Sequence, residues 1–343
     1  MKTKHLKITL CAATLVGLSA PAIAQDANGP HPPGRRGPGG GGPGGSGRIY
    51  SETESKPLEL IPADQEAPFE SQVSIKIEGD SRIISSNVVP EHKIGKFPNA
   101  GNPNTMTEQK ADITLPLKPE MNDQATPART AVGILLNGVY VEAGTGEFWT
   151  GEDGKSRPWN YEALGGAINF GLDENYAHVQ PGGKYHYHGK PAGYLEGIEF
   201  STETHSPIIG WAFDGFPIYA LYGYSDPKDP ESELVEMTSS YRLKKGERPE
   251  PPNGPGGTYD GAFTDDYEYV EGSGTLDECN GRFTVTPDFP EGTYAYFITN
   301  KWPVILRNYR GTPAVKGPGG GGGPGQGGGP GGRRMGPPRG ERN

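Results

Sequence analysis

The chain is 343 residues long, with 42 acidic and 32 basic residues and a formal net charge of −10. The imbalance is concentrated in the middle, because residues 49–315 contain 40 acidic and 21 basic residues, a formal charge of −19 before histidines are counted. A domain this acidic argues against nucleic-acid binding and is compatible with the binding of cations.

Residues 1–24 have the pattern of a secretory signal peptide. Lysines at positions 2, 4 and 7 precede an apolar run over residues 8–20, and Ala-Ile-Ala at 22–24 is a small-residue cleavage site. The apolar run is too short to span a bilayer comfortably, and no other run in the chain approaches that length. We therefore expect cleavage after Ala24 and a periplasmic or secreted protein without a transmembrane segment.

Cleavage would leave Cys279 as the only cysteine of the mature chain, since Cys11 lies in the signal. An internal disulfide framework is then excluded, and the core must hold by burial alone. Cys279 could be a copper thiolate, but a blue-copper site needs His and Met shortly after its Cys, and neither follows shortly here. A buried, inert thiol is the favoured interpretation.

Residues 25–48 and 316–343 are dominated by Gly, Pro and Arg. Such segments bury too little apolar surface to offset chain entropy, so we expect two disordered tails. No strict Gly-X-Y register indicates collagen. The arginines could contact anionic envelope polymers or simply keep the tails soluble.

Residues 49–315 carry recurrent strand signals and no sustained helical period. We expect an all-β, β-sandwich-like single domain with long loops. The runs that predict strands are QVSIKIEG, SRIISSNV, GILLNGVYVEAG, AINFG, PIIGWAFDGFPIYALYGY, YEYVEG, RFTVTP, TYAYFIT and WPVIL.

Turns and short helices complete this prediction. Asn137-Gly138 predicts a hairpin with a type I′ turn, because both residues tolerate positive φ, and Asn280-Gly281 predicts a second hairpin. Helix is expected only as single turns near WNYEAL (159–164) and PAGYLEG (191–197).

Histidines 186 and 188 stand one residue apart in KYHYHG. In an extended strand they share one face, about 6.5–7 Å apart, while Tyr185 and Tyr187 take the other. Two imidazoles so placed can bind one ion at about 2.0–2.1 Å each. Two exposed or hydrogen-bonded core histidines are the alternative.

Three further histidines bear on this choice. His178 is separated from the pair by a Pro-Gly-Gly turn short enough to fold it back over the strand. We predict that His178, His186 and His188 bind copper or zinc, since imidazole suits both ions. His205 is the favoured fourth ligand and His92 the less favoured one.

Other candidate residues have ordinary explanations. Asp214 could be a ligand or a base, but Asp-Gly before Phe-Pro is typical of a turn. Cupins also have a His-x-His strand, yet they place a Glu four or five residues later, whereas Glu196 follows His188 by eight. A plain cupin is therefore excluded.

Several longer blocks resemble the bacterial YHYH-domain family, which is named for residues 185–188. The blocks are SNVVPEHKIGKFPNAGNPN, LLNGVYVEAGTGEFW, GLDENYAHVQPGGKYHYHG, HSPIIGWAFDGFPIY and TLDECNGRFTVTPDFPEGTYAYFIT. The resemblance implies an exported, β-rich domain and supplies no activity.

Three functions remain open from the sequence. The first is a metal-binding module. The second is a metal-dependent enzyme with an open coordination position and Asp214 or Glu196 as base. The third is a structural or cell-surface interaction domain, in which the imidazoles would point apart.

Overall fold

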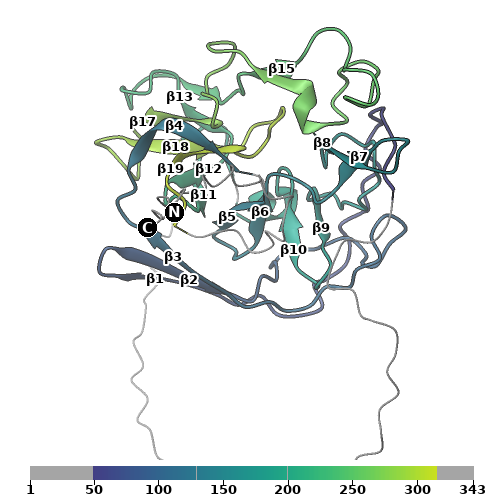
Figure 1. The fold of residues 1–343 in the computed structure, drawn as a ribbon. Coiled ribbons are helices and arrows are strands. Elements are labelled where there is room, and N and C mark those ends of the chain that lie inside the picture. The colour runs from purple at the N-terminus through teal and green to yellow at the C-terminus, as the bar shows by residue number, and fades with distance from the viewer. Residues whose placement is uncertain (1–48, 129, 199, 315–343) are drawn as a thin grey trace, which may run out of the picture. The chain divides into compact units, whose positions relative to one another are not determined.

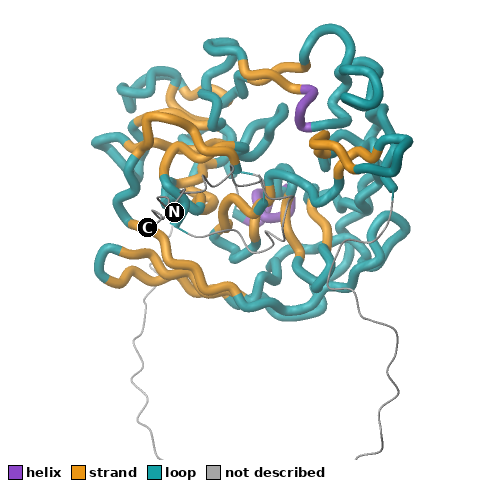
Figure 2. The backbone as a smooth tube through the Cα atoms, viewed as in Figure 1, coloured by secondary structure: helices purple, strands orange, loops and turns teal. Residues whose placement is uncertain are grey.

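The computed structural model describes residues 49–314 apart from Arg129 and Glu199, so the predicted signal peptide and both Gly/Pro-rich tails lie outside it. Within these residues, none of the helices has the length and apolar character needed to cross a membrane. The domain is built almost entirely from strands, which confirms the all-β prediction. Loops account for much of the backbone between them (Figure 2).

The strands form one large sheet and several small ones. The large sheet has eight strands in the order β17-β18-β12-β11-β5-β6-β10-β9, and it is mixed, because β6–β10 and β12–β18 are parallel pairs. Its strands are β5 (Ala131–Leu135), β6 (Tyr140–Glu142), β9 (Ala177–Val179), β10 (Tyr185–Tyr187), β11 (Ile208–Ala212), β12 (Pro217–Tyr219), β17 (Gly281–Thr284) and β18 (Thr293–Phe297). Figure 1 shows β6, β10 and β9 side by side at one end of this sheet.

Five smaller sheets surround it. One has the order β1-β2-β3, and the others pair β4 with β19, β7 with β8, β13 with β14, and β15 with β16. These elements are β1 (Val73–Glu78), β2 (Ser81–Ser86), β3 (Ala111–Pro116), β4 (Met121–Pro127), β7 (Phe148–Thr150), β8 (Ser156–Asn160), β13 (Tyr222–Tyr224), β14 (Leu234–Glu236), β15 (Tyr241–Leu243), β16 (Tyr267–Tyr269) and β19 (Asn308–Gly311).

The main core lies between the large sheet and the three-stranded sheet. Strand β3 alternates buried and exposed residues, so that Ile113 and Leu115 join the same apolar cluster as Ile134 of β5. Strand β5 is buried along its whole length, as a continuous apolar run in a central strand predicts. Arg82 of β2 places its guanidinium 3.2 Å from the ring centre of Trp211 in β11, which ties the two sheets together.

The turn predictions are partly right. Asn137-Gly138 does join the antiparallel strands β5 and β6, but only Gly138 has positive φ (78°), so the turn is not type I′. The Gly138 amide donates to the carbonyl of Leu135, and the turn therefore begins two residues before the Asn-Gly pair. The prediction for Asn280-Gly281 is wrong, because that pair ends a turn from Asp277 and leads into β17.

One of the two helix predictions is right and the other is wrong. Helix α1 (Ala192–Gly197) confirms the turn expected at PAGYLEG, and the structure adds a 3₁₀ helix, η1 (Thr264–Asp266). The segment WNYEAL is not helical, since Trp159 lies in β8 and Tyr161 forms a bridge to Phe263. Trp159 and Tyr161 both pack their rings against Phe263, and this aromatic contact overrides the helical signal.

Candidate metal centre

Strand β10 places the two histidines and the two tyrosines on opposite sides, as the alternation predicts. The strand lies between β6, to which it is parallel, and β9, to which it is antiparallel. His186 pairs directly with His178 of β9, and His188 follows the strand on the same face as His186. The Pro-Gly-Gly turn between β9 and β10 therefore returns His178 to the pair as expected.

The three imidazoles point at one another. The Nε2 atom of His188 lies 3.0 Å from that of His186 and 3.2 Å from that of His178. Two ligands of a tetrahedral ion, each bound at about 2.0–2.1 Å, are themselves separated by about 3.3 Å. One nitrogen of each ring falls within 4.8 Å of the other two, so this histidine group has the spacing of ligands around one ion.

Backbone carbonyls hold the outer nitrogens of two of the rings. His178 Nδ1 lies 3.0 Å from the carbonyl oxygen of Phe170, and His186 Nδ1 lies 3.3 Å from that of Lys184. A carbonyl only accepts hydrogen bonds, so each Nδ1 carries the proton and each Nε2 keeps its lone pair. This is the tautomer that ligation through Nε2 requires.

The protonation state of the group also suits a metal. Only 2 % of His186 and 2 % of His188 is exposed, and His178 is half-buried. Burial lowers the pKa of His186 and of His188 well below the usual value, and it lowers the pKa of His178 as well. The imidazoles are therefore neutral at pH 7, and neutral imidazole is the form that binds metal ions.

The tyrosine face of β10 is hydrogen-bonded throughout. Tyr185 donates to Asp173 Oδ2 at 2.7 Å, and the Nδ2 of Asn137 donates to the Tyr187 hydroxyl at 2.9 Å. His92 lies on this face, with its Nε2 2.5 Å from the same hydroxyl. His92 is therefore a partner of Tyr187, and it is not a member of the histidine group.

Comparison with family models assigns this arrangement to a family. A model described as YHYH protein matches residues 112–311, which is more than half of the chain. The chain belongs to the YHYH family. Searches of the curated proteins and of the solved structures give no match. The matched span includes all three members of the histidine group, whereas the first block that resembles the family, at 86–104, precedes it.

Two charged residues of the YHYH domain accompany the histidine group and were missed in the sequence. Lys184 precedes His186 by two residues and shares its face, and Glu142 ends the neighbouring strand β6. Their side chains form a buried ion pair, and the second carboxylate oxygen of Glu142 lies 3.6 Å from His186 Nε2. Lys184 extends the alternation of His186 and His188 by one step, so the sequence could have placed it on the same face. Nothing in the sequence around Glu142 indicates that β6 lies beside β10.

The structure does not bring His205 to the histidine group. Its Nδ1 lies 2.8 Å from the carbonyl of Ser206, and its ring packs 5.2 Å from the ring centre of Tyr219 and 4.9 Å from that of Tyr224. Its Nε2 is buried and has no hydrogen-bond partner among the described residues. His205 therefore packs among aromatic rings and takes no part in the histidine group.

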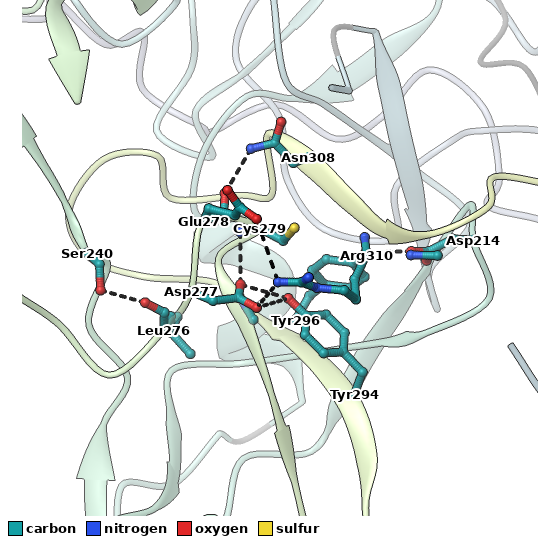
Figure 3. Close-up of polar contacts among 12 residues, drawn as sticks. Asp214, Ser240, Leu276, Asp277, Glu278, Cys279, Tyr294, Tyr296, Asn308 and Arg310 are labelled. Atoms are coloured by element: carbon teal, nitrogen blue, oxygen red, sulfur yellow. Dashed lines mark hydrogen bonds and ion pairs between the residues drawn. The ribbon is translucent and has the colours of Figure 1, made fainter. Parts of the chain in front are cut away.

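Asp214 occupies the turn between β11 and β12 that its Asp-Gly sequence predicts. The Gly215 amide donates to the carbonyl of Ala212, and Gly215 has a φ of 94° that favours glycine. The carboxylate accepts from the Tyr296 hydroxyl at 2.5 Å and from the Gly311 amide at 2.9 Å (Figure 3). Asp214 therefore holds β19 to the end of β11.

Cys279 and Glu196 are also placed outside the histidine group. Cys279 is buried near Asp277, Tyr294 and Arg310, and Figure 3 shows its sulfur beside this polar cluster. Burial raises the pKa of the thiol to about 12, so it carries no thiolate at neutral pH. Glu196 is exposed on α1.

Proposed function

We propose that this YHYH protein is an exported protein that binds one transition-metal ion, copper or zinc, through His178, His186 and His188. The convergence of three Nε2 atoms, two of them in rings whose Nδ1 faces a carbonyl, carries the proposal. Export rests on the N-terminal sequence pattern alone.

The surroundings of the group support a cation over a purely hydrogen-bonded cluster. Three neutral rings that face one another offer more lone pairs than N–H groups toward their common centre, which favours a cation there. The acidic domain raises the local concentration of cations at its surface. Imidazole nitrogen is a ligand that both copper and zinc accept well.

Calorimetric titration of Cu²⁺ and Zn²⁺ into the metal-free, untagged protein tests this proposal. We expect wild type to bind one ion and His186→Ala or His188→Ala to lose at least about 100-fold in affinity, the upper end of the loss caused by changing an outer partner of a metal site. His205→Gln is the matched control, because it replaces a buried histidine of the same domain outside the group. Equal affinities in all four proteins would contradict the proposal.

A structural role is the second candidate, because the 3.0 and 3.2 Å separations also suit hydrogen bonds between neutral rings. It predicts that His186→Ala lowers the free energy of unfolding equally with and without metal. The metal proposal instead predicts a larger loss when metal is present, since only wild type gains from binding.

The third candidate function is an enzyme with an open coordination position on the metal. A cavity of about 180 Å³, lined by Leu58, Ile168 and Phe170 among others, supports this candidate. The Phe170 ring packs edge-on against His178, so the cavity lies one residue away from the group. This candidate requires a coordination position that an added anion can enter.

A further inference from the structure

The ion pair of Lys184 and Glu142 lies directly beside the histidine group. Only 4 % of Lys184 and 8 % of Glu142 is exposed, so water solvates neither charge well. Lys184 lies over the ring of Tyr140, with its ammonium 4.9 Å from the ring centre, and reaches Glu142 Oε1. The carboxylate uses one oxygen for this pair and directs the other toward His186.

The sheet register explains why Glu142 reaches this place. Tyr140 pairs with His186 and Val141 with Tyr187, so Glu142 comes next to His188 across the parallel strands. Side chains directly opposite one another share a face, which puts Glu142 on the histidine face and Val141 on the tyrosine face. Glu142 is accordingly fixed by the backbone of β6 and not by a loop.

The Glu142 carboxylate lies near the distance expected of a further ligand. Glu142 Oε2 lies 3.6 Å from His186 Nε2, which is close to the separation of about 3.3 Å between two ligands of a tetrahedral ion. The carboxylate is offset from the other two rings, because the group whose ligand atoms all lie within 4.8 Å contains only the histidines. Ligation through Oε2 therefore requires the carboxylate to turn toward those two rings on metal binding.

The positive charge around the histidine group also favours a carboxylate ligand. A divalent ion among three neutral imidazoles would add two positive charges to a buried place that already holds the Lys184 ammonium and is within reach of the charge of Arg307. Arg307 is compensated by Glu162 at 3.0 Å, whereas Glu142 has to serve both Lys184 and the ion. A buried charge without a partner is strongly disfavoured, so Glu142 is the group that makes binding possible.

We propose that Glu142 supplies the fourth ligand of the ion through Oε2, with Lys184 orienting the carboxylate through Oε1. This inference rests on the proposed function, and it closes the coordination position that an enzyme would keep open. The resulting set of three nitrogens and one oxygen contains no thiolate or thioether, so it favours Zn²⁺ and Cu²⁺ over Cu⁺. Ligating carboxylates are commonly held by an outer hydrogen bond of this kind.

Glu142→Gln tests the inference, with Asp277→Asn as the matched control. The control removes the charge of another ion-paired carboxylate, which is bound to Arg310 at 2.8 Å and precedes β17 at the opposite edge of the sheet. We expect calorimetry to give a Zn²⁺ affinity for Glu142→Gln at least about 100-fold below that of wild type. The control should bind as wild type does.

Azide added to the Cu²⁺-loaded proteins provides a readout of coordination. We expect no azide-to-copper charge-transfer band in wild type, where Glu142 fills the fourth position, and a clear band in Glu142→Gln, where that position admits the anion. Should Glu142→Gln not fold, Glu142→Asp keeps the charge and the lysine but is one methylene too short to reach the ion. Its Cu²⁺ form should admit azide as well.

The outcomes separate the two proposals. If wild type binds one ion while Glu142→Gln binds it equally tightly and azide enters both, the Glu142 inference is wrong and the histidine proposal stands. If wild type binds neither Cu²⁺ nor Zn²⁺, both are wrong.

Discussion

The two faces of β10 come from the same four-residue motif, but their polar atoms have different partners. On the tyrosine face, each hydroxyl has a dedicated partner, as in the bond from Tyr185 to Asp173. On the histidine face, the Nδ1 atoms of His178 and His186 point outward to carbonyls, and the three Nε2 atoms face one another. A face whose polar atoms are all satisfied stabilises the fold, whereas one that leaves lone pairs directed at a common centre is suited to a ligand.

Lys184→Met, on the histidine face, should cause the largest loss in the free energy of unfolding. The variant leaves Glu142 buried without its cation, and breaking such a pair costs about 3–5 kcal/mol. Urea denaturation of the metal-free protein should show this loss in the free energy of unfolding. Saturating Zn²⁺ should reduce the loss, because the ion replaces the ammonium as the partner of the carboxylate.

Lys190→Met is the control for that experiment. Lys190 is the next lysine along the chain, and its ammonium donates to the exposed Asn300. Its replacement should change the free energy of unfolding by no more than about 0.5 kcal/mol. A loss in Lys184→Met that is equal with and without Zn²⁺ would mean that the ion does not interact with Glu142.

An intermediate effect is expected from Tyr185→Phe on the opposite face. The change removes a hydrogen bond to the buried carboxylate of Asp173, which costs about 1.5–3 kcal/mol of stability. Metal affinity should stay that of wild type, since the histidine face is untouched. Tyr194→Phe serves as the control, because the Tyr194 hydroxyl is buried and has no hydrogen-bond partner among the described residues. A loss of metal affinity in Tyr185→Phe would mean that the two faces are not independent.

The smallest effect concerns the pH dependence of stability. Burial raises the pKa of the Asp173 carboxyl in the folded protein. The folded state then binds this proton more tightly than the unfolded state, whose pKa is about 3.9. The carboxyl therefore favours folding most below about pH 3.9, and it costs stability as the pH rises through the folded pKa.

Comparison with Asp173→Asn isolates this contribution. The free energy of unfolding of wild type, measured relative to that of the variant, should fall as the pH is raised from about 3.5 to about 7. A relative stability that stays constant or rises over this range would show that hydrogen bonds from Gly95 and Tyr185 outweigh burial.

The sequence was informative where the geometry is local. The alternation in β10 predicts the division of faces, and the Pro-Gly-Gly turn predicts the return of His178, because both depend on a dozen consecutive residues. The parallel pairing of β6 with β10 joins segments more than 40 residues apart, and strand periodicity does not reveal which strands become neighbours. Glu142 was missed for this reason.

The same limit accounts for the placement of His205 and for the turn errors. His205 is near the motif in sequence, but it precedes β11 and packs among aromatic rings. Asn137-Gly138 identifies a hairpin correctly, yet the turn type depends on where the strand hydrogen bonds stop. Residue type fixes which turns are allowed, and the surrounding sheet selects among them.

Strand β9, which carries His178, is the last strand of the large sheet, and among the described strands only β10 pairs with it. Side-chain amides of Asn102 and Asn104 both donate to the carbonyl of Val179 and so blunt the free edge. Fraying of this strand separates His178 from His186, and the proposed ion would act as a cross-link against it. Metal occupancy and the protection of this edge from strand addition by other chains are therefore thermodynamically linked, and loss of the ion would also expose the chain to aggregation.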